Sequence, residues 1–141
     1  MSELFADANL FLRYLTNDIP AQADAVEALL DRAEAGELTL ITNSHTVAEL
    51  VWVLTGFYGL SKTETQARIL GVLRTPGVVV AEERMVLQAL AWFVGKNVDY
   101  IDAYQAAWMQ ERGLDKVATF DQKHFRRFEH LQVVVPGAEG T

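Results

Sequence analysis

The hydrophobic positions of the chain alternate between short apolar runs and longer stretches in which apolar residues recur every three to four positions. The apolar runs, rich in branched aliphatic residues, lie at 4–6, 38–42, 78–80, 116–119 and 131–135. The stretches with helical spacing lie between them, at 7–16, 20–36, 44–54, 63–74, 82–94 and 99–113, with a short helical turn at 121–125. The pattern therefore predicts strands and helices in alternation.

This alternation predicts an α/β fold. Uniformly apolar strands separated by helices are typical of a central, mostly parallel β-sheet flanked by helices on both faces. A chain of 141 residues has the usual size of one domain. We expect a single domain over residues 1–141, with the folded core at 3–136 and a loose tail at 137–141.

Composition and charge exclude several classes of protein and kinds of site. The net charge of −7 argues against a surface that coats nucleic acid, because such binding depends on Lys and Arg, but it permits a nuclease with an acidic metal site. The absence of cysteine excludes disulfides, thiolate zinc sites and a cysteine nucleophile. No apolar run approaches the roughly 18 to 20 residues that span a bilayer, and the N-terminus lacks a basic leader, so we expect a cytoplasmic protein.

Four acidic residues follow strands or lie in the first turns of predicted helices: Asp7, Glu49, Asp102 and Asp121. In an open parallel sheet such positions converge at the carboxyl ends of the strands. Carboxylates gathered without matching cations repel one another unless a positive charge lies among them, and a divalent metal ion supplies it. The four residues are therefore candidate metal ligands.

Each of these residues also has a simpler interpretation. Asp7 and Asp121 suit helix N-caps. Glu49 stands in a helix that is apolar nearly all round, with no Lys or Arg three or four residues away, so it lies at a solvent-facing edge or is buried with a partner. Asp99 is the natural cap of the helix that contains Asp102, which leaves Asp102 for the site.

Histidine and tryptophan offer weaker candidates. The three histidines share no ligand spacing such as i and i+4 on one helix, so we expect them outside the site; they are His45, His124 and His130. The three tryptophans have Leu and Val neighbours at helical spacing, which predicts core packing rather than stacking on bases; they are Trp52, Trp92 and Trp108.

The segments around the four acids resemble a known family. They are FADANLFLRYL at 5–15, the isolated Glu49 in its apolar helix, DYIDA at 99–103 and TFD at 119–121. Together they look like the four acidic motifs of PIN-domain ribonucleases, with the closest similarity to the VapC-like toxins of prokaryotic toxin–antitoxin pairs. The resemblance covers essentially the whole chain in order, with one departure at Ala8, where the family often has a small hydroxyl residue.

The resemblance implies a metal-dependent endoribonuclease that hydrolyses RNA phosphodiester bonds with Mg²⁺ or Mn²⁺. Asp7, Glu49 and Asp102 would hold the principal metal, and Asp121 would support a second metal or a bound water. Three further residues would orient these carboxylates from an outer shell; they are Asn9, Thr119 and Asp99.

RNA and protein partners also follow as expectations. Arg13, Arg126 and Arg127 are candidates for contact with RNA phosphates. The resemblance implies a small antitoxin that lays a helix into an apolar groove and directs a basic side chain toward the acidic site. It also suggests a homodimer, for which the apolar segments 47–58 and 63–73 offer surface.

Two other functions stay open at this stage. A non-catalytic binding module would keep the PIN-like fold and use the acids as helix caps. An aspartyl-phosphate phosphatase or phosphotransferase would phosphorylate Asp7 and would need a lysine at the end of a late strand. Lys116 begins its predicted strand instead, which disfavours the second of these.

Overall fold

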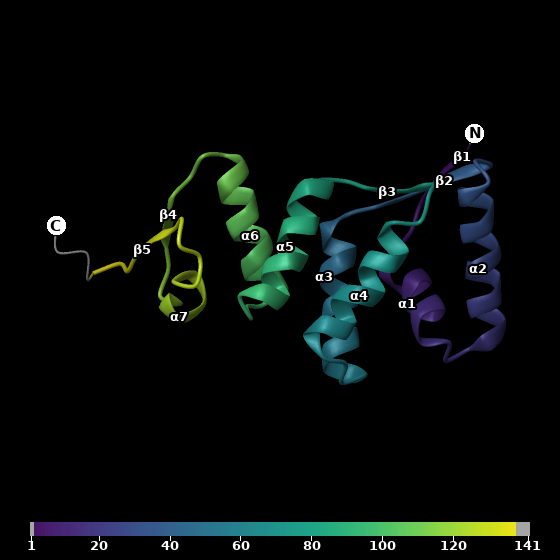
Figure 1. The fold of residues 1–141 in the computed structure, drawn as a ribbon, viewed down its shortest axis with the longest axis horizontal. Helices are drawn as coiled ribbons and strands as arrows, with labels where there is room; N and C mark the ends of the chain where they lie inside the picture. The colour runs from purple at the N-terminus through teal and green to yellow at the C-terminus, as the bar shows by residue number, and fades with distance from the viewer. Residues whose placement is uncertain (1, 138–141) are drawn as a thin grey trace. The chain divides into compact units, whose positions relative to one another are not determined.

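Two compact units make up the chain, residues 1–83 and residues 84–141 (Figure 1). The computed structural model describes residues 2–137. The loose tail predicted at 137–141 lies, after Gly137, outside the described residues. That the two units act as a single domain stays a prediction.

The first unit alternates strands and helices as the sequence predicts. Its elements are β1 (Ser2–Phe5), α1 (Ala8–Thr16), α2 (Pro20–Glu34), β2 (Leu38–Thr42), α3 (Ser44–Trp52), the π-helical turn η1 (Val53–Phe57), α4 (Lys62–Leu73) and β3 (Val78–Val80).

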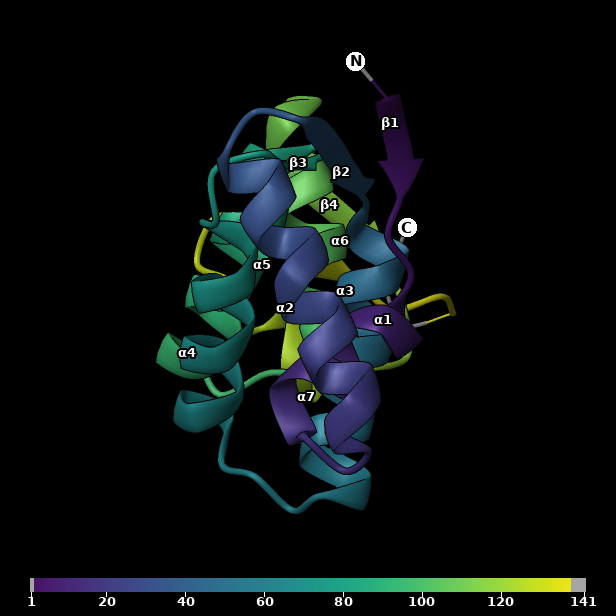
Figure 2. The same ribbon diagram turned by 90° about the vertical axis from the view of Figure 1, so that its right-hand side faces the viewer.

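Three parallel strands lie side by side in this unit, in the order β1-β2-β3 (Figure 2). Leu4 pairs with Leu40 across β1 and β2, and Thr42 pairs with Val80 across β2 and β3. The central strand β2 alternates buried and half-buried side chains, whereas β1, at an edge of the sheet, is exposed along its length. Helix α2 packs against β2 and β3, and α4 packs against β3.

Side-chain caps fix where α3 and α4 begin. Asn43 accepts a hydrogen bond from the backbone N–H of Thr46 at the start of α3, and Ser61 accepts one from Glu64 at the start of α4. Both bonds satisfy N–H groups that lack a partner within the helix. Because β2 ends at Thr42 and α3 begins directly after it, the cap at Asn43 also sets the phase in which α3 presents Glu49.

The second unit contains α5 (Glu83–Gly95), α6 (Tyr100–Glu111), β4 (Lys116–Ala118), α7 (Gln122–Phe125) and β5 (Gln132–Val134). Its strands β4 and β5 pair in parallel, with Val117 opposite Val133. Every strand pair among the described residues is therefore parallel, and the predicted α/β class is confirmed. The strands form one sheet of three and one of two, where the sequence predicted one central sheet.

Two features of the helices differ from the sequence-based expectation. The backbone N–H of Tyr58 donates to the carbonyl of Val53 at 3.2 Å, a π-type bond that follows α3 directly. The prediction that Trp52, at the end of α3, lies in the core is wrong, since 75% of this residue is exposed. Trp92, by contrast, contacts Phe128 edge to face at a centroid distance of 5.2 Å.

No helix within residues 2–137 is long and apolar enough to cross a membrane.

Two buried threonines give opposite expectations for stability. The hydroxyl of Thr42 donates to the carbonyl of Ala6 at 2.9 Å, whereas the buried hydroxyl of Thr65 has no hydrogen-bond partner within residues 2–137. We expect Thr42→Val to lower the free energy of unfolding by about 1–2 kcal/mol, because a buried bond is lost. We expect Thr65→Val to raise it by up to about 1 kcal/mol, because an unsatisfied polar group is removed. Urea denaturation measures both, and shifts of the same sign would contradict the assignment.

Candidate metal centre

Asp7 lies at the junction between β1 and α1. Its Oδ1 accepts a hydrogen bond from the backbone N–H of Leu10 at 3.0 Å, which makes Asp7 the N-cap of α1. The backbone is held there by the sheet, since the N–H of Ala6 donates to the carbonyl of Ile41 at 2.8 Å. Capping engages one carboxylate oxygen, and a carboxylate has a second one with which to ligate a metal ion.

Glu49 lies in α3 at the solvent-facing edge, one of the two placements that its apolar surroundings allow. Its side chain is 54% exposed, and Oε1 lies 3.0 Å from Nε2 of His45, one turn earlier on the same helix. The sequence shows no Lys or Arg within one turn of Glu49, but it does show this histidine at i−4.

A concavity in the first unit brings Glu49 together with two other predicted residues. Its lining includes Asn9 and Arg13 of α1 beside Glu49 of α3, and its volume is about 430 Å³. Asp18 and Tyr58 also line it, and the Tyr58 hydroxyl donates to the Asp18 carboxylate. The buried Nε of Arg13 has no hydrogen-bond partner among the described residues. Polar groups of both charges therefore face one concave surface.

The start of α6 carries two acidic residues of the second unit. Asp99 occupies the N-cap position, but its side chain accepts no capping hydrogen bond, so of the two roles predicted for it, cap and outer shell, the second stays a prediction. Asp102 lies in the first turn of α6 with a side chain that is 19% exposed. Residues three apart share one face of a helix, so both carboxylates lie on the same side of the start of α6.

Asp121 caps the short helix α7 and contacts His124 in two ways. Its Oδ1 accepts from the backbone N–H of His124 at 3.3 Å, and its Oδ2 lies 3.2 Å from Nδ1 of the same residue. The Thr119 hydroxyl accepts from the backbone N–H of Asp121 at 2.9 Å. Thr119 thus fixes the backbone that carries the carboxylate, while its predicted contact with a carboxylate stays a prediction.

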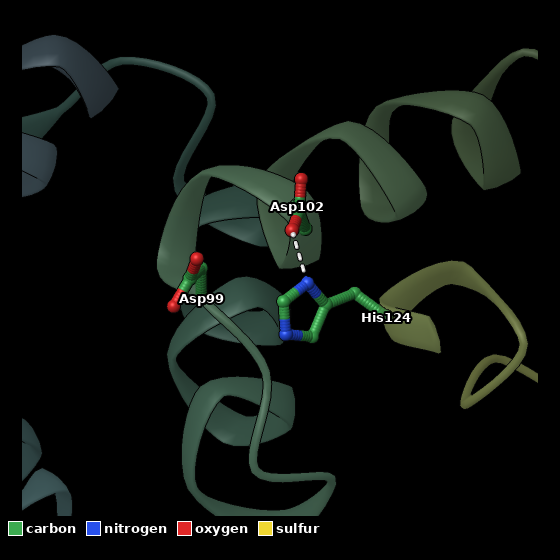
Figure 3. Close-up of side chains that lie close together, drawn as sticks. All are labelled: Asp99, Asp102 and His124. Carbon is green, nitrogen blue, oxygen red and sulfur yellow. Dashed lines mark ion pairs between the residues drawn. The ribbon is translucent and has the colours of Figure 1, made fainter. Parts of the chain in front are cut away.

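The histidine of α7 also reaches α6. Nδ1 of His124 lies 3.5 Å from Oδ2 of Asp102 (Figure 3). Each of Asp99, Asp102 and His124 offers a ligand atom, and the three atoms lie within 4.8 Å of one another. One imidazole is therefore shared by carboxylates from two separate helices.

The two aspartates respond to this arrangement in opposite directions. Partial burial, followed by repulsion from Asp121 and Asp99, raises the pKa of Asp102, and His124 opposes this rise. Hydrogen bonds from the backbone and side chain of His124 lower the pKa of Asp121. Asp102 therefore carries a charge that the folded chain disfavours, and a bound cation would relieve that cost.

The candidate RNA-binding arginines of α7 differ in their surroundings. Arg126 donates from Nη2 to Oε1 of Gln122 at 2.7 Å and is exposed. Arg127 donates from Nη1 to the carbonyl of Lys96 at 3.2 Å and also to the carbonyl of Asn97. Arg127 therefore has a structural role, and contact of either arginine with RNA stays a prediction.

Comparison with known proteins decides the family. The sequence profile of the PIN domain matches residues 4–131, nearly the whole chain. The chain belongs to the PIN domain family. PIN domains are nuclease domains that generally use divalent metal ions. No curated protein matches this PIN domain in sequence.

Two solved structures are similar to this PIN domain. The structure of VapBC2 from Rickettsia felis, bound to a DNA fragment from its promoter, is 14% identical with a TM-score of 0.38, over 96% of this chain and 98% of that chain. The structure of VapC20 from Mycobacterium tuberculosis, a sarcin-ricin loop cleaving toxin, is 19% identical with a TM-score of 0.36, over 87% and 93% of the two chains. The family assignment rests on the domain match.

The structure of this PIN domain brings some of the predicted site residues together within each unit. Glu49, Asn9 and Arg13 line one concavity, and Asp102 and Asp121 share His124. That Asp7 and Glu49 of the first unit act with Asp102 and Asp121 of the second stays a prediction.

His124 is the residue that the sequence analysis missed. Spacing between histidines carries no signal in this sequence, whereas the relevant spacing joins Asp121 to His124. In that segment the N-cap Asp121 is followed three residues later by a histidine whose Nδ1 lies 3.2 Å from Oδ2 of the cap. An Asp-x-x-His segment directly after a strand was therefore the available signal.

Lys116 is the first residue of β4, so the phosphotransferase alternative gains nothing from the structure.

Proposed function

We propose that this PIN domain is a metal-dependent endoribonuclease and the toxin component of a toxin–antitoxin pair. The observation that carries the proposal is the gathering of Asp99, Asp102 and Asp121 around His124 in a chain that the PIN domain profile matches over residues 4–131. The four acidic motifs in the sequence support it further.

The donor set fits a hard divalent cation. Carboxylate oxygens and water suit Mg²⁺ and Mn²⁺, and Asp102 already lies in a field that disfavours its charge. When bound, such an ion activates a water molecule, orients the scissile phosphate and stabilises the negative charge that develops on it. Asp7, Glu49 and Asp102 would hold the ion, and Asp121 would hold a second ion or a water.

The remaining polar residues would bind and position RNA. Arg13 presents a guanidinium beside Asn9 and Glu49 in the concavity of the first unit. Arg126 is exposed and accessible to a phosphate, and Arg127 has further donors besides the Nη1 that binds the backbone. These residues would neutralise phosphate charge, which a chain of net charge −7 otherwise repels.

The proposed antitoxin would contact an apolar surface. Trp52 and Phe57 are 75% and 81% exposed and line a second concavity with Val53 and Gly56. Large exposed apolar side chains at such a surface are typical of binding sites for an amphipathic helix. A homodimer is the other assembly that we propose for a chain with this apolar surface.

Incubation of a mixed cellular RNA pool with the purified protein tests the proposed function. We expect discrete fragments with Mg²⁺ or Mn²⁺, and their loss with EDTA or with the Asp7→Asn variant. Calorimetric metal titration and thermal melting run on the same samples. Absence of cleavage together with absence of a metal-dependent rise in melting temperature would reject the nuclease and favour a non-catalytic binding module.

A further inference from the structure

Helix capping accounts for only part of the cluster around His124. Asp121 caps α7 by accepting from the backbone N–H of His124, and this local bond accounts for the proximity of these two residues. Asp99 and Asp102 lie on another helix, and the Asp99 side chain caps no N–H group. Yet Asp99, Asp102 and His124 place three potential ligand atoms within 4.8 Å of one another.

That spacing is close to what one metal ion requires. At a metal–ligand distance of about 2.1 Å, ligand atoms in octahedral geometry are about 3.0 Å apart when adjacent and about 4.2 Å apart when opposite. Since the three atoms already lie within 4.8 Å of one another, small side-chain rotations would bring them into this range. All three residues belong to the second unit, to the start of α6 and to α7 (Figure 3).

We infer that His124 supplies an imidazole nitrogen to the metal ion that Asp102 holds, that Asp99 is a ligand of the same ion in place of its outer-shell role, and that this nitrogen makes the site prefer Mn²⁺ to Mg²⁺. The inference rests on the proposed metal-dependent function and names which ion serves it. Imidazole binds transition metals far better than it binds Mg²⁺, which takes oxygen ligands and retains its waters. Asp121 Oδ2 contacts the ring at Nδ1, so Nε2 is the nitrogen that would bind the metal, and Asp121 then orients the imidazole, the role that a carboxylate commonly has beside a metal-binding histidine.

Pulsed electron paramagnetic resonance of the full chain with Mn²⁺ tests this directly, because it detects nitrogen nuclei coupled to the ion. We expect nitrogen coupling in the wild type and its loss in His124→Gln. The substitution leaves the cap of α7 in place, since Asp121 accepts there from the backbone N–H. His124→Asn serves as a second substitution should Gln disturb α7, and circular dichroism checks the fold of each variant.

His45→Gln is the matched control. His45 also lies beside a carboxylate, 3.0 Å from Glu49, but it belongs to the first unit and its side chain is 83% exposed. We expect this variant to keep the nitrogen coupling. Loss of the coupling in His45→Gln, or its persistence in a folded His124 variant, would overturn the inference.

Metal affinity provides a second readout. By calorimetry we expect His124→Gln to weaken Mn²⁺ binding about tenfold or more and Mg²⁺ binding much less, so that the preference for Mn²⁺ falls. Asp99→Asn should weaken Mn²⁺ binding and keep the nitrogen coupling. Mn²⁺ bound by the wild type without nitrogen coupling would overturn the inference and leave the nuclease intact. Absence of any binding of Mn²⁺ or Mg²⁺ would overturn both.

Discussion

Asp102→Asn is expected to lower the rate of metal-dependent RNA cleavage by a factor of roughly 10²–10³. The substitution keeps the shape of the side chain but removes the negative charge that would bind the metal. A metal ion contributes several kcal/mol to the stabilisation of transition-state charge, and each loss of about 1.4 kcal/mol lowers the rate tenfold. Initial rates of cleavage of a defined fragment, at saturating Mg²⁺ and Mn²⁺, measure the effect.

The same variant should be no less stable than the wild type when metal is absent. Burial and the neighbouring charges of Asp121 and Asp99 raise the pKa of Asp102, so its ionised form is less favourable in the folded chain than in the unfolded chain. Removal of that charge at neutral pH relieves this cost. A metal-free melting temperature equal to or above that of the wild type would therefore accompany the loss of cleavage.

Asp115→Asn is the matched control for charge. Asp115 is exposed in the second unit, and its backbone carbonyl, which the substitution keeps, accepts from the N–H of Gln132 at 2.7 Å. We expect cleavage within about twofold of the wild type, in line with the small effects of surface substitutions. An equal loss of cleavage in both variants would show that general negative charge, and not a ligand at Asp102, sets the rate.

Gly77→Ala is expected to have the largest effect on stability. Gly77 has φ of +89°, and a Cβ atom there would lie 2.3 Å from the carbonyl oxygen of Ala33 at the end of α2. The left-handed conformation costs a residue with a Cβ about 1–2 kcal/mol, and the forced displacement of backbone costs about 1–3 kcal/mol more. Since domains are stable by only about 5–15 kcal/mol, we expect a loss of roughly 2–5 kcal/mol in urea denaturation.

Gly36→Ala separates the two causes of that loss. Gly36 has φ of +81°, but a Cβ atom there would meet nothing within 4 Å. We expect only the conformational cost of about 1–2 kcal/mol. Equal losses in the two variants would mean that contact between Gly77 and α2 does not contribute.

The sequence predicts local structure well because local rules determine it. The alternation of apolar runs and helical stretches locates the strands and helices of both units, and at Asn43 and Ser61 side-chain caps satisfy helix N–H groups. The turn η1 is not visible in the pattern, because five residues are too few to show a change of period. The exposure of Trp52 was missed for a related reason: periodicity marks an apolar face but does not say whether anything covers it.

The candidate site could be predicted less completely. The positions of Asp7 and Asp121 follow from strand ends and helix caps, and both act as caps in the structure. The role of Asp99 could not be read from its position, because an N-cap residue need not direct its side chain to the helix it precedes. The Asp-x-x-His spacing pairs His124 with Asp121, but the contact of His124 with Asp102 could be found only from the approach of α7 to α6 in space.

Arg127 also ties together the two ends of the segment that carries this cluster. Its guanidinium binds the carbonyls of Lys96 and Asn97, thirty-one and thirty positions earlier in the sequence. Asp99, Asp102, Asp121 and His124 all lie within the segment between these contacts, so they belong to one loop that a side chain closes without a covalent bond. The entropy of closing a loop grows only slowly with its length. Opening this contact would free one tie between the two ends of the segment that carries all four residues, so we expect local opening there to affect the acidic cluster as a whole.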